Sequence, residues 1–262
     1  MSTLNIPGVT LIDASSAEKT PENYGLYGHL TTGKSHLGAD AAKFYQDQGM
    51  SVIYVVTPGE DPYTTLKSFG LGGIIAPVKS VKEFETLMDK IAKKIDVCIL
   101  DSMKGLNRLS MDSVIGKNKY PADGKEWAPV HDAFESVVNK WKDATPISIF
   151  LCPADRSSDS FVDPGAKKPN LITCDLPGKM AAQIRGAVSY MGYIESELDE
   201  ETRVFKRTIT FVPQRGVLTL ARGLVNQMTE PIVLDPGYNG NWAKIQEAFE
   251  AHRVIETPVE AA

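Results

Sequence analysis

The chain has 262 residues, of which 42% are hydrophobic and 23% are charged, and its formal net charge is −5. This length and composition predict one large globular domain with ample core. The negative charge argues against a DNA-binding protein of the strongly basic kind. Any contact with nucleic acid must therefore come from local basic loops, or from a surface that several subunits form together.

Cysteine usage and hydropathy indicate where the protein works. Cys98, Cys152 and Cys174 have no metal-ligand spacing, and an odd number of cysteines without a disulfide framework is typical of the reducing cytosol. The first residues lack the charged and apolar segments of a signal peptide, and no apolar run approaches the ~20 residues that span a bilayer. We therefore expect a cytoplasmic protein with no membrane segment.

The first motif follows an N-terminal arm over residues 1–22. A short strand over Tyr24–Gly28 leads into Gly28-His-Leu-Thr-Thr-Gly33-Lys34-Ser35, which fits G-x-x-x-x-G-K-[ST] at every fixed position, and a helical pattern continues to Gln48. A loop of this kind, between a strand and a helix, binds phosphate. Its glycines let several N–H groups point at one anion, and the helix adds the positive end of its dipole.

This motif predicts the contacts of a bound nucleotide. We expect Lys34 to reach the β- and γ-phosphates and the Ser35 hydroxyl to bind Mg²⁺. A chance match in a glycine-rich turn is the competing interpretation, and the flanking strand and helix argue against it. The expected nucleotide-binding residues are Gly28, His29, Leu30, Thr31, Thr32, Gly33, Lys34, Ser35 and His36.

Two further strands predict the opposite wall of the site. The run over Ser51–Thr57 is continuous and β-branched, which is typical of a strand buried on both faces of a parallel sheet, and Glu60 follows it closely. After an amphipathic helix over Ser80–Lys94, four apolar residues lead to Asp101. A carboxylate that ends a buried parallel strand lies in the ligand crevice, so we expect Asp101 to hold Mg²⁺.

Long polar segments follow. Residues 103–126 show no sustained periodicity and predict a loop, and a second loop is expected over Ser157–Asp175, after a helix over Trp127–Lys142 and a strand over Ile147–Cys152. Long loops in a compact domain are usually functional or disordered, and a solvated surface loop is the competing interpretation. Basic side chains on these loops are candidates to contact the phosphates of DNA. These candidates are Lys104, Arg108, Lys117 and Lys119 in the first loop and Lys167 and Lys168 in the second.

The last part of the chain predicts an antiparallel edge. The expected elements are a helix to about Gly186, two strands over Val188–Ile194 and Arg203–Val212, a strand over Gly216–Ala221, a loop past Pro231 and a helix over Trp242–His252. Strands that alternate with helices and then give way to a hairpin indicate an α/β fold with a mostly parallel sheet. We expect an arm (1–22), a core (23–232) and a C-terminal helix with tail (233–262).

This order of elements resembles the RecA-like branch of the P-loop NTPases. In that branch an extra strand comes between the phosphate-loop strand and the Mg²⁺-Asp strand, and its end carries a catalytic Glu. Glu60 has the matching place, with Asp61 as its competitor. Asp101-Ser102 with its long loop, the Leu176–Lys179 segment and an Arg-bearing hairpin are similar to small phage-encoded ATPases that consist of a RecA core alone. Cys152-Pro153 departs from the polar amide usual in RecA proteins.

The resemblance implies an Mg²⁺-dependent ATPase that acts on single-stranded DNA in recombination or replication, in the host cytoplasm if the chain is phage-encoded. It also implies a homo-oligomer, either a ring or a filament. Glu60 would polarise the attacking water. Arg215 and Arg222, which flank the strand near the C-terminal end of the core, would reach the γ-phosphate of a neighbouring subunit. The alternative is that they are surface arginines beside acidic residues.

Two other functions stay open at this point. The phosphate loop also suits a kinase of a small molecule or nucleotide, in which one long loop covers the acceptor. It equally suits a scaffold protein that binds ATP and hardly turns it over. The sequence contains no base-specific motif that separates ATP from GTP.

Overall fold

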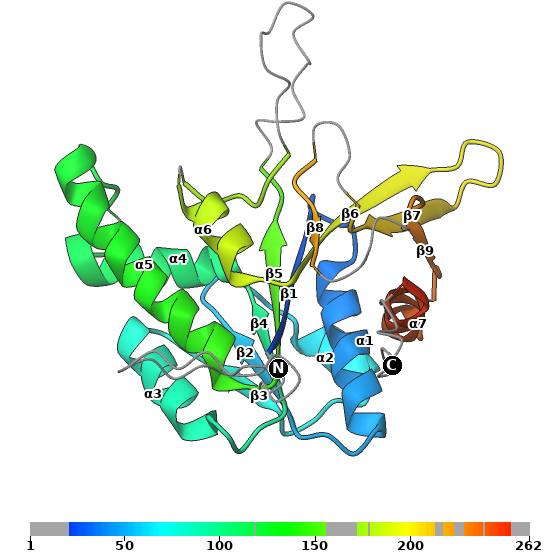
Figure 1. Ribbon diagram of the computed structural model, residues 1–262, viewed down its shortest axis with the longest axis horizontal. Helices are drawn as coiled ribbons and strands as arrows, with labels where there is room; N and C mark the ends of the chain where they lie inside the picture. Colours follow the sequence, from blue (N-terminus) through cyan, green and yellow to red (C-terminus); the bar gives the residue numbers. More distant parts are fainter. Residues whose placement is uncertain are drawn as a thin grey trace, which may run out of the picture.

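The computed structural model of the chain (Figure 1) describes residues 21–117, 119–155, 172–177, 179–212, 217–222, 228–237 and 239–252. Several expectations fall outside the described residues. These are the arm up to residue 20, most of the second long loop, and the candidate site residues Arg215, Lys167 and Lys168.

The described strands form one sheet in the order β3-β2-β4-β5-β1-β6-β7-β9, with β8 paired to β6. The pairs from β3 across to β6 are parallel, whereas β7, β8 and β9 join antiparallel. This confirms the predicted α/β fold with a mostly parallel sheet and an antiparallel hairpin. The strands are β1 (Glu22–Gly28), β2 (Val52–Val56), β3 (Ile75–Pro77), β4 (Val97–Asp101), β5 (Ile147–Pro153), β6 (Tyr190–Leu198), β7 (Phe205–Thr210), β8 (Leu220–Ala221) and β9 (Ile232–Leu234).

Helices cover both faces of the sheet. Figure 1 shows α3, α4, α5 and α6 on one side and α1 and α7 on the other, and α2 packs against α1. None of the helices in the described part of the chain has the length and apolar character of a membrane span. Their bounds are α1 (Lys34–Asp47), α2 (Tyr63–Ser68), α3 (Val81–Ile91), α4 (Met103–Ile115), α5 (Gly124–Ala144), α6 (Met180–Ala187) and α7 (Asn241–His252).

Strand register brings the predicted site residues to one edge of the sheet. Gly28 at the end of β1 pairs with Pro153 of β5, and Asp101 at the end of β4 pairs with Val56 of β2. In the sheet it is β5 that lies between β1 and β4, although β2 comes between them in the chain. The connections that leave β1, β2, β4 and β5 therefore meet at the carboxyl edge, where open α/β sheets bind ligands.

The C-terminal helix α7 is part of the same core as β1. The Trp242 ring lies edge-on to the Tyr24 ring, with centroids 5.3 Å apart. The Asp40 carboxylate on α1 accepts hydrogen bonds from the backbone N–H groups of Gly240 and Trp242, at 2.9 and 2.6 Å, and so satisfies groups at the start of α7 that have no partner within the helix. β9 spans the predicted boundary at residue 232, and the division of the chain there stays a prediction.

The structure corrects the loop prediction for residues 103–126. Most of the first half is helix α4, which starts after Ser102 and buries Leu106, Leu109 and Met111. The helical period is hard to recognise in the sequence because Gly105 and small polar residues also lie on the buried side. Two short elements were also not expected, namely α2 and the edge strand β9 in the segment predicted as loop after Pro231.

Candidate nucleotide-binding site

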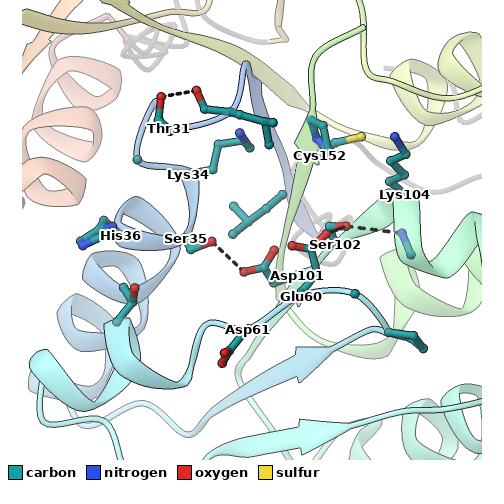
Figure 2. Close-up of a pocket in the computed structure, with 18 of the residues that line it drawn as sticks. Thr31, Lys34, Ser35, His36, Glu60, Asp61, Asp101, Ser102, Lys104 and Cys152 are labelled. Carbon is teal, nitrogen blue, oxygen red and sulfur yellow. Dashed lines mark hydrogen bonds between the residues drawn. The ribbon is translucent and has the colours of Figure 1, made fainter. Parts of the chain in front are cut away.

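A cavity of about 670 Å³ opens at the carboxyl edge of the sheet, between the phosphate loop, the segment after β2, the start of α4 and the end of β5. Figure 2 shows Lys34 and Ser35 on one side of this cavity, with Glu60, Asp101 and Ser102 facing them from other elements. A concave site with a few convergent polar groups at this edge is the usual ligand site of an open α/β sheet.

The phosphate loop has the conformation that its glycines predict. Gly33 has a φ of 91°, in the left-handed region that side chains disfavour, and its carbonyl accepts the N–H of Leu37 at 2.9 Å to start α1. The loop therefore ends at a helix N-terminus, which favours an anion. Leu30, Thr31, Gly33, Lys34, Ser35 and His36 line the cavity. The other three predicted contacts, Gly28, His29 and Thr32, lie in the loop but do not line it.

Lys34 is held inside the loop by backbone oxygens. Its Nζ donates to the carbonyls of Gly28 and His29, at 2.9 and 2.6 Å. Burial lowers the pKa of Lys34, and the charges of nearby Asp101 and Glu60 oppose that change. Among the described residues, both hydrogen-bond partners of this partly desolvated ammonium group are neutral carbonyls, so it is well suited to bind an anionic ligand such as a phosphate.

Asp101 is the most buried carboxylate of the cavity, at 3% exposure. Its Oδ2 accepts hydrogen bonds from the Ser35 and Tyr54 hydroxyls, both at 3.0 Å. Burial raises the pKa of Asp101 to about 6, and the Glu60 charge adds to the rise. A hydroxyl and a buried carboxylate oxygen this close fit the oxygen donors that Mg²⁺ takes, and a divalent cation would offset the buried negative charge.

Glu60 lies in the same cavity as Asp101, and its carboxylate is held by Ser102, the residue after Asp101. The Ser102 hydroxyl donates to Glu60 Oε1 at 2.6 Å, although the two residues come from different strand ends. Asp61 also lines the cavity. The Asp101–Ser102 peptide bond is cis. The structure thus places Glu60 in the same cavity as the phosphate loop, as the sequence predicts, and leaves the choice between Glu60 and Asp61 as water-activating group a proposal.

The basic residues predicted for DNA divide into two groups. Lys104 and Arg108 lie on α4 and line the nucleotide cavity itself. Lys104 forms an ion pair with Asp175, and Arg108 with Asp112 at 2.9 Å. Arg108 also lies over the exposed Tyr120 ring, 5.1 Å from its centroid. The second group, Lys117 and Lys119, follows α4 on the exposed surface.

Arg222 lies at the opposite edge of the sheet from the phosphate loop. Its backbone N–H donates to the carbonyl of Ser189, whose own N–H donates to the carbonyl of Asn23 near the start of β1. Gly28 lies five positions after Asn23 along β1, a span of about 17 Å. Arg222 does not line the cavity of its own subunit, so the predicted contact with a γ-phosphate requires a second copy.

Comparison with known families agrees with this geometry. The sequence matches a family model described as an AAA domain over residues 20–222. The chain therefore belongs to this AAA-domain family of nucleotide-binding P-loop NTPases. No curated protein matches the sequence.

The side of the cavity formed by the ends of β2 and β4 carries Glu60 and Asp101, and we call it the acidic wall. Three polar residues that hold the acidic wall together were not predicted from the sequence. Tyr54 interrupts an aliphatic strand, and a buried tyrosine hydroxyl needs a partner, which is Asp101 here. Thr57 directly follows the same strand and exchanges hydrogen bonds with the backbone of Ser102, at 2.9 and 3.1 Å. Of the three, only Tyr54 could have been found from the sequence, because a tyrosine stands out in an aliphatic strand. Thr57 and Ser102 have no such signal, since their partners lie about forty residues away along the chain.

Proposed function

We propose that the protein is an Mg²⁺-dependent ATPase. The observation that carries this proposal is the 3.0 Å hydrogen bond between Ser35 of the phosphate loop and Asp101 at the end of β4, within one cavity that also contains Lys34 and Glu60. This brings a phosphate-binding cation, two oxygen donors for a divalent metal and a second carboxylate into one site. The AAA-domain family supports the nucleotide; the preference for ATP is part of the proposal.

Each residue has a defined task in this proposal. Lys34 leaves the loop carbonyls and binds the β- and γ-phosphates, together with the N–H groups of the loop. Ser35 and Asp101 would hold Mg²⁺, which supplies positive charge for the phosphate oxygens. Glu60 accepts a proton from, and thereby orients, the water that attacks the γ-phosphate. The carboxylate is already fixed by Ser102, so little reorganisation is needed.

We further propose that hydrolysis is coupled to single-stranded DNA, in recombination or replication. The resemblance to RecA-core ATPases of phages supports this, as does the placement of α4. That helix carries Lys104 and Arg108 in the cavity and ends just before the exposed Lys117 and Lys119. DNA phosphates bound by these basic residues would contact α4, the helix that begins beside Glu60, and could thereby influence hydrolysis. The same resemblance is the support for proposing that the protein assembles and that Arg222 reaches the γ-phosphate of a neighbouring copy.

A kinase is the second candidate, and one observation favours it. The cavity extends past Glu60 to two cations on α4, Lys104 and Arg108, which would also suit the charged group of a small acceptor. In a kinase, a carboxylate beside the γ-phosphate accepts the proton of the acceptor hydroxyl, as Glu60 would.

One set of assays tests these alternatives. ATP hydrolysis is measured with and without single-stranded DNA, and particle size is measured with and without nucleotide. Stimulation by DNA together with nucleotide-dependent assembly supports the proposed ATPase. Turnover that needs a small hydroxyl-bearing acceptor supports the kinase. Tight ATP binding without turnover under all these conditions contradicts both and indicates a scaffold protein.

A further inference from the structure

Ser102 makes contacts in two directions at once. Its hydroxyl donates to Glu60 Oε1 at 2.6 Å and accepts the backbone N–H of Gly105 at 3.4 Å, which makes it the N-cap of α4. The residue is 2% exposed, so water has little access to its hydroxyl. A serine hydroxyl has one proton to give, and that proton is committed to Glu60.

The backbone around Ser102 is fixed by the end of β2. The N–H of Ser102 donates to Thr57 Oγ1 at 2.9 Å, Thr57 Oγ1 donates to the Ser102 carbonyl at 3.1 Å, and the N–H of Thr57 donates to the Asp101 carbonyl at 2.8 Å. Gly105 then packs directly on Thr57: a Cβ at this position would lie 2.0 Å from Thr57 Oγ1. The segment that carries Glu60 and the first turn of α4 therefore form one tightly packed unit.

Glu60 needs such a support because it lies near another carboxylate. Glu60 and Asp101 line the same cavity, and the residue next to Asp101 donates directly to Glu60, so the two carboxylates are close neighbours. Among the described residues, the Ser102 hydroxyl is the donor to the Glu60 side chain and it binds Oε1, so Oε2 is available to accept a proton from water. Without the Ser102 hydroxyl, the Glu60 carboxylate would lose the hydrogen bond that fixes Oε1, and its orientation in the cavity would no longer be set.

We infer that Ser102 is a positioning residue, which holds the Glu60 carboxylate for proton transfer and ties its place to the N-terminus of α4. This inference rests on the proposed ATPase function and on the role of Glu60 within it. It adds that the placement of α4 controls the water-activating group. A ligand that moves the first turn of α4 therefore changes the rate of the chemical step more than the affinity for nucleotide.

The test compares steady-state ATP hydrolysis with binding of a fluorescent ATP analogue. Ser102→Ala should lower kcat about tenfold or more, because the carboxylate loses its orientation, while KM and the Kd of the analogue change less than about twofold. Ser102→Thr, which keeps a hydroxyl and a good N-cap, should restore most of kcat. Ser102→Gly gives a second variant without the hydroxyl, because glycine is tolerated at N-caps, and it should show the same loss of kcat.

Ser80→Ala is the matched control for loss of a helix cap. Ser80 caps α3 by accepting the N–H of Glu83 at 3.2 Å, and it does not line the nucleotide cavity. Both serine-to-alanine variants should lower Tm by a few degrees, about 2–4 °C, and only Ser102→Ala should lower kcat. An equal loss of kcat in Ser80→Ala would show that the effect is general destabilisation and would overturn the inference.

A double-mutant cycle separates this inference from the proposed function. Glu60→Gln should lower kcat by about 10²–10⁴-fold, and adding Ser102→Ala to it should cause no further loss beyond about twofold. Full activity in Glu60→Gln contradicts the role proposed for Glu60. An inactive Glu60→Gln together with fully active Ser102→Ala and Ser102→Gly leaves the proposed function standing and overturns the positioning role. A further loss in the double variant equal to that in Ser102→Ala alone also overturns it.

Discussion

The two walls of the nucleotide cavity are built in different ways. The phosphate-loop wall is one continuous segment, and its hydrogen bonds are local: Lys34 bonds to Gly28 and His29, five or six residues away in the chain. The acidic wall joins the ends of β2 and β4, and the bond from Ser102 to Glu60 joins residues 42 positions apart. One wall is a local motif and the other exists only once the sheet has formed.

Because of this difference, we expect the two walls to respond differently to mutation. A residue in the local wall is expected to lose its own function without changing the fold, because its neighbours stay in place. A residue in the acidic wall supports partners from distant segments, so its loss is expected to change stability and catalysis together. The predictions below test this contrast, in order of decreasing effect.

The largest effect is expected for Lys34→Ala in the local wall. Hydrolysis should fall by at least about 10²–10³-fold, because the principal cation for the terminal phosphates is removed. The circular dichroism spectrum should stay that of the wild type. Lys43→Ala, on the exposed surface of the same helix, is the control and should keep full activity. Undiminished hydrolysis in a folded Lys34→Ala protein would contradict the nucleotide assignment.

Asp101→Asn is expected to change activity and stability together, but in opposite directions. Hydrolysis should fall about 100-fold, because a metal-binding carboxylate is lost. In EDTA without nucleotide, however, the variant should be the more stable protein above pH 6. The folded-state pKa of Asp101 is about 6 and the reference value is 3.8, so the folded wild type binds this proton more tightly than the unfolded chain. Wild-type stability therefore falls as pH rises from about 4 to 6, by up to about 3 kcal/mol.

Thermal unfolding between pH 4 and pH 8 measures this effect. The difference in Tm between Asp101→Asn and wild type should be near zero at pH 4 and constant above about pH 7. Asp96→Asn provides a control of opposite sign. Hydrogen bonds from Ser51 lower the pKa of Asp96, so its charge stabilises the fold and its removal should lower Tm at neutral pH. A Tm difference for Asp101→Asn that does not change with pH would contradict the prediction.

Gly105→Ala should damage the acidic wall through packing. The added Cβ would lie 2.0 Å from Thr57 Oγ1 and 2.6 Å from Thr57 Cβ, so α4 and the end of β2 must separate. We expect a loss of about 1–3 kcal/mol in the free energy of unfolding and a lower kcat. Gly186→Ala within α6 meets no atom within 4 Å and should instead stabilise the protein, by up to about 1 kcal/mol. Denaturant titration of both variants makes the comparison.

The smallest effect is expected on the exposed surface after α4. Lys117→Ala combined with Lys119→Ala should weaken binding of single-stranded DNA severalfold and reduce the slope of log K against log salt by about 1.4, since each phosphate contact contributes about 0.7. ATP hydrolysis without DNA should not change. Lys82→Ala combined with Lys90→Ala on α3 removes the same charge elsewhere and should leave DNA affinity unchanged. Equal losses in both pairs would indicate that the total charge acts, rather than a site.

Much of the fold was predictable because its signals are local. Continuous apolar runs identified β2, β4 and β5, and the amphipathic pattern identified α3. Helix α4 was missed because small and polar residues share its buried side, so its burial depends on what packs there and not on a clear apolar period. The edge strand β9 was missed because a three-residue strand is defined by its partner β7.

By itself, the sequence determined the phosphate loop, since a glycine-rich turn before a helix needs only neighbouring residues to form its bonds. It also placed Asp101 at the end of a buried strand. Only the tertiary structure decided that Tyr54, Thr57 and Ser102 support the acidic wall, because strand order and register bring these segments together. The tertiary structure also decided that Lys104 and Arg108, which the sequence assigned to a loop, lie on α4 and line the cavity, because α4 starts at the edge of the sheet where the ligand site forms.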